Sequence, residues 1–178
     1  MLKPGVWILA TLLAVIAGWT DWRTRRIPNW LTVPSLLLGI ALNSLAWGWP
    51  GAKDSLLGAL LGLALLLPFV LIRALGAGDW KLVGAMGAFV GPQTLISILL
   101  IAVLIAGVMG AALIIWKRRV GQTLRNLWRM LQSFLTLHLP GPEFTLENPS
   151  ALKVPFGVAF ASAAILYNAH RIWELFVA

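Results

Sequence analysis

Residues 55–75, SLLGALLGLALLLPFVLIRAL, carry a single charged side chain, Arg73, near the end of an apolar run. A helix needs about 20 mostly apolar residues to cross the hydrocarbon core of a bilayer, so this stretch predicts a transmembrane helix. Further apolar segments lie at 5–20, 30–48, 80–91, 93–116 and 154–173. The sequence therefore predicts an all-α, polytopic membrane protein with about six transmembrane helices, which form one domain over residues 1–178.

The composition excludes an ordinary soluble domain and a disordered chain, because 60% of the 178 residues are hydrophobic and only 11% are charged. There is no cysteine, and therefore neither a disulfide nor a cysteine-based zinc site. His138 and His170 are separated by a loop and the last segment, so we expect no metal and no cofactor. The net charge of +8 comes mostly from basic residues that flank apolar segments. That pattern favours a membrane topology signal over a nucleic-acid partner.

The basic residues also predict an orientation. Eleven of the fourteen Lys and Arg follow the first segment, flank the turn between the third and fourth, or lie in the connection 117–153. By the positive-inside rule the N-terminus lies outside, and Asp21 and Asp79 lie at the cytoplasmic face. One alternative stays open: Lys3, the apolar run and the small residues at 14–18 also resemble a cleaved signal peptide, which would place Asp21 on the other side.

Segment 80–91 is too short to cross a bilayer, and it lies between GAGD at 76–79 and the pair Gly91-Pro92. A short helix is expected here if its start is buried in the bundle and lines a watery cavity. In the connection 117–153, apolar residues recur at helical spacing, which predicts an interfacial helix on the cytoplasmic leaflet, followed by a loop at 138–149. A docking surface for a membrane-bound substrate is the alternative interpretation of that helix.

Two of the six acidic residues lie at predicted membrane edges, Asp21 and Asp79. Carboxylates at membrane depth are costly and usually mark function, and two on one side predict a proton-sharing pair like that of an aspartic protease. Each also has a simpler explanation. Asp79 is in place to cap a helix by accepting the N–H of Lys81 or Leu82. Asp21 is in place for an exposed ion pair with the arginines that follow it.

The run DWRTRRIPN, residues 21–29, resembles the first aspartate motif of the prepilin peptidases, also called type IV leader peptidases. GAGDWKL, residues 76–82, is similar to their second, the GxGD motif with its following lysine. KVPFG, residues 153–157, resembles the proline-containing opening of the family's last helix. Order, spacing and the six-segment layout fit as well, so the resemblance covers nearly the whole chain. The paired motifs are specific, whereas either one alone is not.

The resemblance implies an intramembrane aspartic endopeptidase that cuts the short basic leader, ending in glycine, from type IV prepilins or pseudopilins. It places the active site at the cytoplasmic face of the bacterial inner membrane, and family substrates carry a glutamate near the start of the mature apolar segment. Carried onto this sequence, Asp21 and Asp79 are the catalytic pair, and they activate a water. The chain lacks the four-cysteine zinc region of the larger members, so we expect peptidase without N-methyltransferase activity, as in tight-adherence (Flp-type) systems.

The supporting residues are Gly76, Gly78, Lys81, Pro28 and Asn29. The glycines permit close helix approach at the second motif. Lys81 is expected to stabilise the aspartate anion, to bind the substrate glutamate or to anchor the topology. Pro28 suits the first turn of the second segment, where Asn29 is expected to bond the backbone.

Two other functions remain as alternatives to the peptidase. One is a small proton- or cation-coupled transporter that uses the aspartates as relays, although no internal repeat supports it. The other is a non-catalytic membrane scaffold of a pilus or secretion machine. The sequence names neither the substrate nor the oligomeric state.

Overall fold

The computed structural model describes residues 4–135 and 154–177, which form helices and contain no strand. The helices are α1 (Pro4–Thr24), α2 (Asn29–Leu71), α3 (Ala77–Trp116), α4 (Val120–Leu135) and α5 (Phe156–Val177). By length and composition, α1, α2 and α3 can each cross a membrane. The prediction of an all-α, polytopic membrane protein is confirmed.

Two of these helices each combine two of the predicted segments. Inside α2, Gly48 has φ 63° and ψ −142°, and inside α3, Gly91 has φ 76° and ψ 173°. Left-handed φ values suit glycine, and a proline follows within two residues in each case. The predicted boundaries at 48 and 91 are therefore breaks within longer helices. We call the part of each helix before its break the first limb and the part after it the second limb.

The two limbs of α2 run back along each other. The Asn43 side chain donates a hydrogen bond to Ser55 Oγ at 2.8 Å. Twelve residues of straight helix would separate the two by about 18 Å, so the chain must reverse at Gly48. Asn43 also donates to the carbonyl oxygens of Ala88 and Phe89, both at 3.0 Å. This buried polar cluster ties α3 into the fold of α2.

The first limb of α3 is the centre of the bundle. Every residue from Leu82 to Gly91 is buried, and the limb packs against α2, α5 and α1. Gly58 of α2 lies directly on the backbone of Gly87, so the glycine pair Gly58 and Gly62 serves helix packing. The short segment predicted at 80–91 is thus half-buried at its first two residues and buried from Leu82 onward, and whether its start lines a watery cavity stays a prediction. The 14 residues of α3 before the break, 77–90, span about 21 Å, which is less than a bilayer core.

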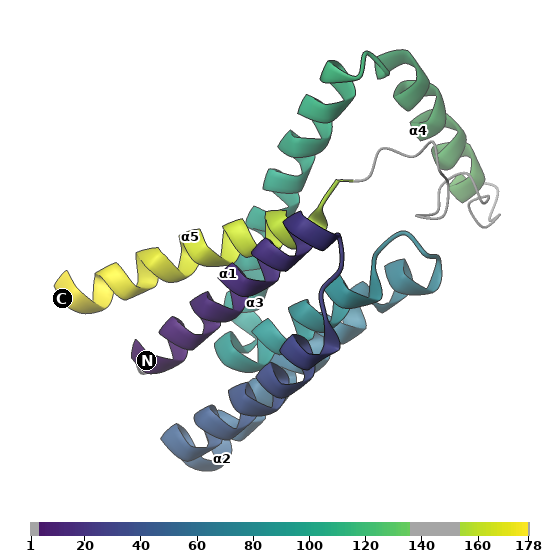
Figure 1. Ribbon diagram of the computed structural model, residues 1–178. Helices are drawn as coiled ribbons and strands as arrows, with labels where there is room; N and C mark the ends of the chain where they lie inside the picture. The colour runs from purple at the N-terminus through teal and green to yellow at the C-terminus, as the bar shows by residue number, and fades with distance from the viewer. Residues whose placement is uncertain (1–3, 136–153, 178) are drawn as a thin grey trace.

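The first helix is part of this core. Ala10, Ala14 and Ala17 are fully buried, and Gly18 lies against Ala161 of α5 so closely that an added Cβ would be 2.8 Å away. Figure 1 shows α1 beside α5 along most of its length. Without α1, α5 would lose its main packing partner, which argues against the signal-peptide alternative.

The helix α4 begins the predicted polar connection and stands apart from the bundle (Figure 1). Its described side chains are mostly exposed, including Leu124 and Trp128 at 65% and 62%. The helix prediction for this region is met over Val120–Leu135, and whether it lies on a lipid surface stays a prediction. The rest of the connection, with the loop expected at 138–149, lies outside the described residues.

Candidate active site

The first predicted catalytic residue, Asp21, lies in the last turns of α1 and faces the start of α5. Its side chain is only 7% exposed. Its Oδ2 accepts a hydrogen bond from the backbone N–H of Val158 at 3.0 Å, and the backbone N–H of Gly157 lies beside the carboxylate as well. These are first-turn N–H groups of α5, which have no partner inside their own helix. A helix N-terminus binds anions, so α5 holds this carboxylate in place.

Gly157 makes this contact sterically feasible. A Cβ at this position would lie 2.8 Å from Asp21 Oδ2 and 2.9 Å from Ile27 Cδ1. The described part of this motif, residues 154–157, therefore has a physical role: it begins a helix at Phe156 and leaves room for a carboxylate at Gly157. This motif was visible in the sequence, but nothing there paired it with Asp21, which lies 137 residues before Val158.

The other predicted catalytic residue, Asp79, is the third residue of α3. Gly76 is the N-cap, with φ −70° and ψ 140°, so the expectation that Asp79 itself caps the helix is wrong. Instead the Asp79 carboxylate lies beside the backbone of Gly76, the place that the third residue takes in a capping box. A Cβ on Gly76 would lie 2.9 Å from Asp79 Oδ2. The second oxygen, Oδ1, is buried without a hydrogen-bond partner in the described structure.

Ile27 joins the two carboxylate sites. It is 8% exposed, and it follows the end of α1. A Cβ on Gly78 would lie 3.0 Å from the Ile27 carbonyl oxygen, and a Cβ on Gly157 would meet the Ile27 side chain. Asp79 also lies within range of the charge on Asp21. The two motifs therefore meet around one buried isoleucine, with Gly78 serving close approach as expected.

The first turn of α3 is held by two further bonds. Lys81 Nζ donates to Asn29 Oδ1 at 3.0 Å, and Trp80 Nε1 donates to the carbonyl of Leu63 at 2.7 Å. The bond of Asn29 to Lys81 replaces the backbone contact that the sequence suggested, and it links the first motif to the second. Pro28 is the N-cap that directly precedes α2, with φ −75° and ψ 146°, and not a residue of its first turn.

The exposed ion-pair explanation of Asp21 does not fit its burial. Arg23, Arg25 and Arg26 are exposed, whereas the Asp21 carboxylate is buried against α5. The charge of Arg25 acts on Asp21, but the backbone of α5 supplies its hydrogen bonds. Within 4–135 and 154–177, no three His, Cys, Asp or Glu side chains gather as a metal site would require.

Comparisons with known proteins identify the family of this chain. The model of the type IV leader peptidase family matches residues 7–111, a range that contains both aspartates. A prepilin leader peptidase/N-methyltransferase of Escherichia coli K12 is 37% identical over 127 residues, which cover 66% of this chain and 55% of that protein. Proteins of the same name are 34% identical in Aeromonas hydrophila, over 64% of this chain and 43% of the relative, and 36% identical in Klebsiella pneumoniae, over 57% and 49%.

The chain spans about half the length of the curated relatives that it matches. No solved structure matches it. The matched family region covers more than half of the chain and includes α1, α2 and most of α3, the elements that carry both aspartates. This chain therefore belongs to the type IV leader peptidase family.

Proposed function

We propose that this protein is an intramembrane aspartic endopeptidase that removes the short leader from type IV prepilins or pseudopilins, with Asp21 and Asp79 as its catalytic pair. The observation that carries the proposal is the meeting of two buried or half-buried carboxylates around Ile27, each beside a glycine that leaves it room. Membership of the family supports the substrate class, because the relatives are named for prepilin leaders.

The chemistry needs one base and one acid. Two carboxylates in one site do not readily both ionise, so they share a proton. The ionised group takes a proton from a bound water, which attacks the scissile carbonyl. The protonated group hydrogen-bonds the carbonyl oxygen and then protonates the leaving amine. The proton belongs to the pair and not to one residue. Asp79 Oδ1, which is buried and unpartnered, is an atom available to the water or to the substrate.

The cytoplasmic side of the bacterial inner membrane is the proposed location of this site. Three segments lie at one end of the bundle: the end of α1, the turn between α2 and α3, and the start of α5 (Figure 1). The start of α1 and the end of α5 lie at the other end. Arg23, Arg25, Arg26 and Arg73 belong to that end, which supports the orientation under the positive-inside rule.

The partners in this proposal are the lipid bilayer and a prepilin whose basic leader ends in glycine, and a tight-adherence pilin is the first substrate to try. The relatives' names join peptidase and N-methyltransferase, and we propose the peptidase alone for this chain. The mass of the cleaved pilin tests that part, since methylation would add about 14 Da to its new N-terminus.

Co-expression with a tagged prepilin tests the function. We expect wild type to shorten the prepilin, and Asp21→Asn and Asp79→Asn to slow cleavage by about 10⁴-fold, the scale of loss when a catalytic carboxylate is removed. Asp54→Asn is the matched control, because Asp54 contacts Gly91, at the break between the two limbs of α3, and should leave cleavage intact. All variants must accumulate equally in the membrane.

Cleavage that survives either catalytic substitution would remove that aspartate from the mechanism. If no leader from a panel is cut by wild type, a scaffold or transporter role replaces the peptidase.

A further inference from the structure

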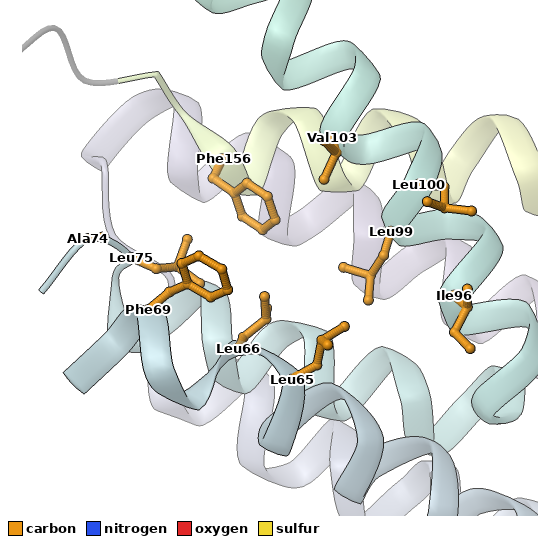
Figure 2. Close-up of a pocket in the computed structure, with 10 residues that line it drawn as sticks. All are labelled: Leu65, Leu66, Phe69, Ala74, Leu75, Ile96, Leu99, Leu100, Val103 and Phe156. Carbon is orange, nitrogen blue, oxygen red and sulfur yellow. The ribbon is translucent and has the colours of Figure 1, made fainter. Parts of the chain in front are cut away.

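An apolar groove of about 400 Å³ opens on the lipid-facing side of the bundle (Figure 2). Its walls are the second limbs of α2 and α3 and the turn between the two helices, and the first residue of α5 closes one end. All ten lining residues are Leu, Ile, Val, Phe or Ala. Leu65, Ile96 and Val103 are 52%, 45% and 61% exposed, so the groove is accessible from the bilayer.

The groove ends beside both aspartates. Leu75 lines it, and the next residue, Gly76, packs on the Asp79 carboxylate. Phe156 lines it from the other side, and the next residue, Gly157, packs on the Asp21 carboxylate. Figure 2 shows Phe156 and Leu75 at the same end of the groove, with Ile96 at the far end. A chain leaving the carboxylate pair toward the bilayer therefore enters this groove.

We propose that the groove holds the first turns of the apolar helical segment that follows the scissile bond of the substrate. This inference rests on the proposed peptidase function. The wall of α3 runs from Ile96 to Val103, about 10.5 Å along the helix, which matches two turns of a bound helix. No lining residue carries a charge, so the basic leader is excluded and must lie on the polar side of the carboxylates.

Apolar character alone does not decide the occupant of the groove. Lipid tails are as apolar as leucine, so an apolar groove does not prefer the substrate over lipid. An acyl chain would fill the groove without reaching the carboxylates, whereas a peptide is joined to the bond that they cut. The groove thus sets the depth at which the substrate helix lies and aligns its first peptide bonds with the carboxylate pair.

The test narrows the groove and compares two substrates. Val103→Trp places a large ring inside it, and Leu104→Trp, one residue further on α3 and 70% exposed outside the lining, is the matched control. On the intact prepilin we expect Val103→Trp to lower kcat/KM about tenfold and Leu104→Trp to stay within about twofold. A short peptide with the same leader and scissile bond but no apolar segment should be cut equally by both variants.

Equal cleavage of the intact prepilin by both variants would overturn the inference, and so would an equal loss on the short peptide, which would indicate a disturbed active site. If wild type cuts neither substrate, the proposed function fails instead.

A binding measurement then tests the groove separately, using the lack of cysteine in this chain. A prepilin with one cysteine in the first two turns of its apolar segment should cross-link to the Val103→Cys variant and not to Leu104→Cys. Equal cross-linking to both, or none to Val103→Cys, would refute the occupation of the groove by the substrate.

Discussion

Replacing Gly157 by alanine tests the geometry of the proposed site with one methyl group. The new Cβ would lie 2.8 Å from Asp21 Oδ2 and 2.9 Å from Asp21 Cγ, where ordinary contacts begin at 3.4 Å. The carboxylate or the start of α5 must therefore move by about 0.6 Å, and misplacement of about 1 Å costs about 10²-fold in rate. We expect kcat to fall about 10- to 100-fold, equivalent to about 1.4–2.8 kcal/mol of transition-state stabilisation.

The protein should still fold, because overpacking of a core by one methyl group costs about 1–3 kcal/mol. The assay is prepilin cleavage in membranes at equal protein level, with thermal unfolding in detergent measured in parallel. Gly107→Ala is the matched control on α3, since a Cβ there meets nothing within 4 Å. It should cleave at the wild-type rate.

A second substitution separates the two contacts of the new methyl group. Ile27→Val removes the Cδ1 atom that would lie 2.9 Å from it and leaves the contact with Asp21 unchanged. If displacement of Asp21 causes the loss, Gly157→Ala combined with Ile27→Val stays slow. Recovery in the double variant, or a Gly157→Ala protein that cleaves within twofold of wild type, would refute the reasoning.

Three other expectations follow from the same contacts. Lys81→Met and Asn29→Ala should each lower cleavage a few-fold, and the double variant should lower it no further. Each substitution removes the same exposed hydrogen bond, which is worth about 0.5–1.5 kcal/mol. Additive losses in a double-mutant cycle would contradict this. Asn43→Ala removes the hydrogen bonds to the buried carbonyls of Ala88 and Phe89, of which Ala88 keeps a donor in Ser55 Oγ, and should cost about 1–3 kcal/mol of stability, seen as a lower Tm in detergent with kcat unchanged in the protein that remains folded. Cleavage should be bell-shaped with pH, because a doubly protonated pair lacks its base and a doubly ionised pair lacks its acid; a flat profile from pH 4 to 9 with chemistry rate-limiting would count against the pair.

Hydropathy made most of the helices predictable, because the cost of burying polar groups in lipid acts on each segment separately. The same local rule identified 80–91 as a short helix inside the bundle, and its burial from Leu82 onward agrees. The reversal of α2 was not predictable in this way. It depends on Asn43 meeting Ser55 and the carbonyls of α3, and pairings between distant polar groups leave no periodic signal.

The two aspartates of the candidate site could be predicted from the sequence, whereas the groups around Asp21 could not. Asp21 and Asp79 stood out because charges are rare in this chain, and the two glycines Gly76 and Gly78 come just before Asp79 in the sequence. The partners of Asp21 did not stand out, because a backbone N–H has no residue type to mark it. The available signal was the opening of the last helix, where first-turn donors need an acceptor. Ile27 gave no signal, since one isoleucine among arginines resembles any short linker.

Three arginines that follow helix ends have left-handed backbone conformations. Arg25, Arg73 and Arg118 follow the ends of α1, α2 and α3, and all three have left-handed φ values of 53°, 57° and 52°. That conformation costs a non-glycine residue about 1–2 kcal/mol, which is why helices commonly end on glycine. The helix dipole returns only about 0.3–1 kcal/mol for a cation at a C-terminus. An arginine near an anionic leaflet gains about 1 kcal/mol more, and the two together offset the strain. The presence of arginine at all three ends therefore supports a membrane surface at this end of the bundle, the side on which the proposed catalytic pair lies.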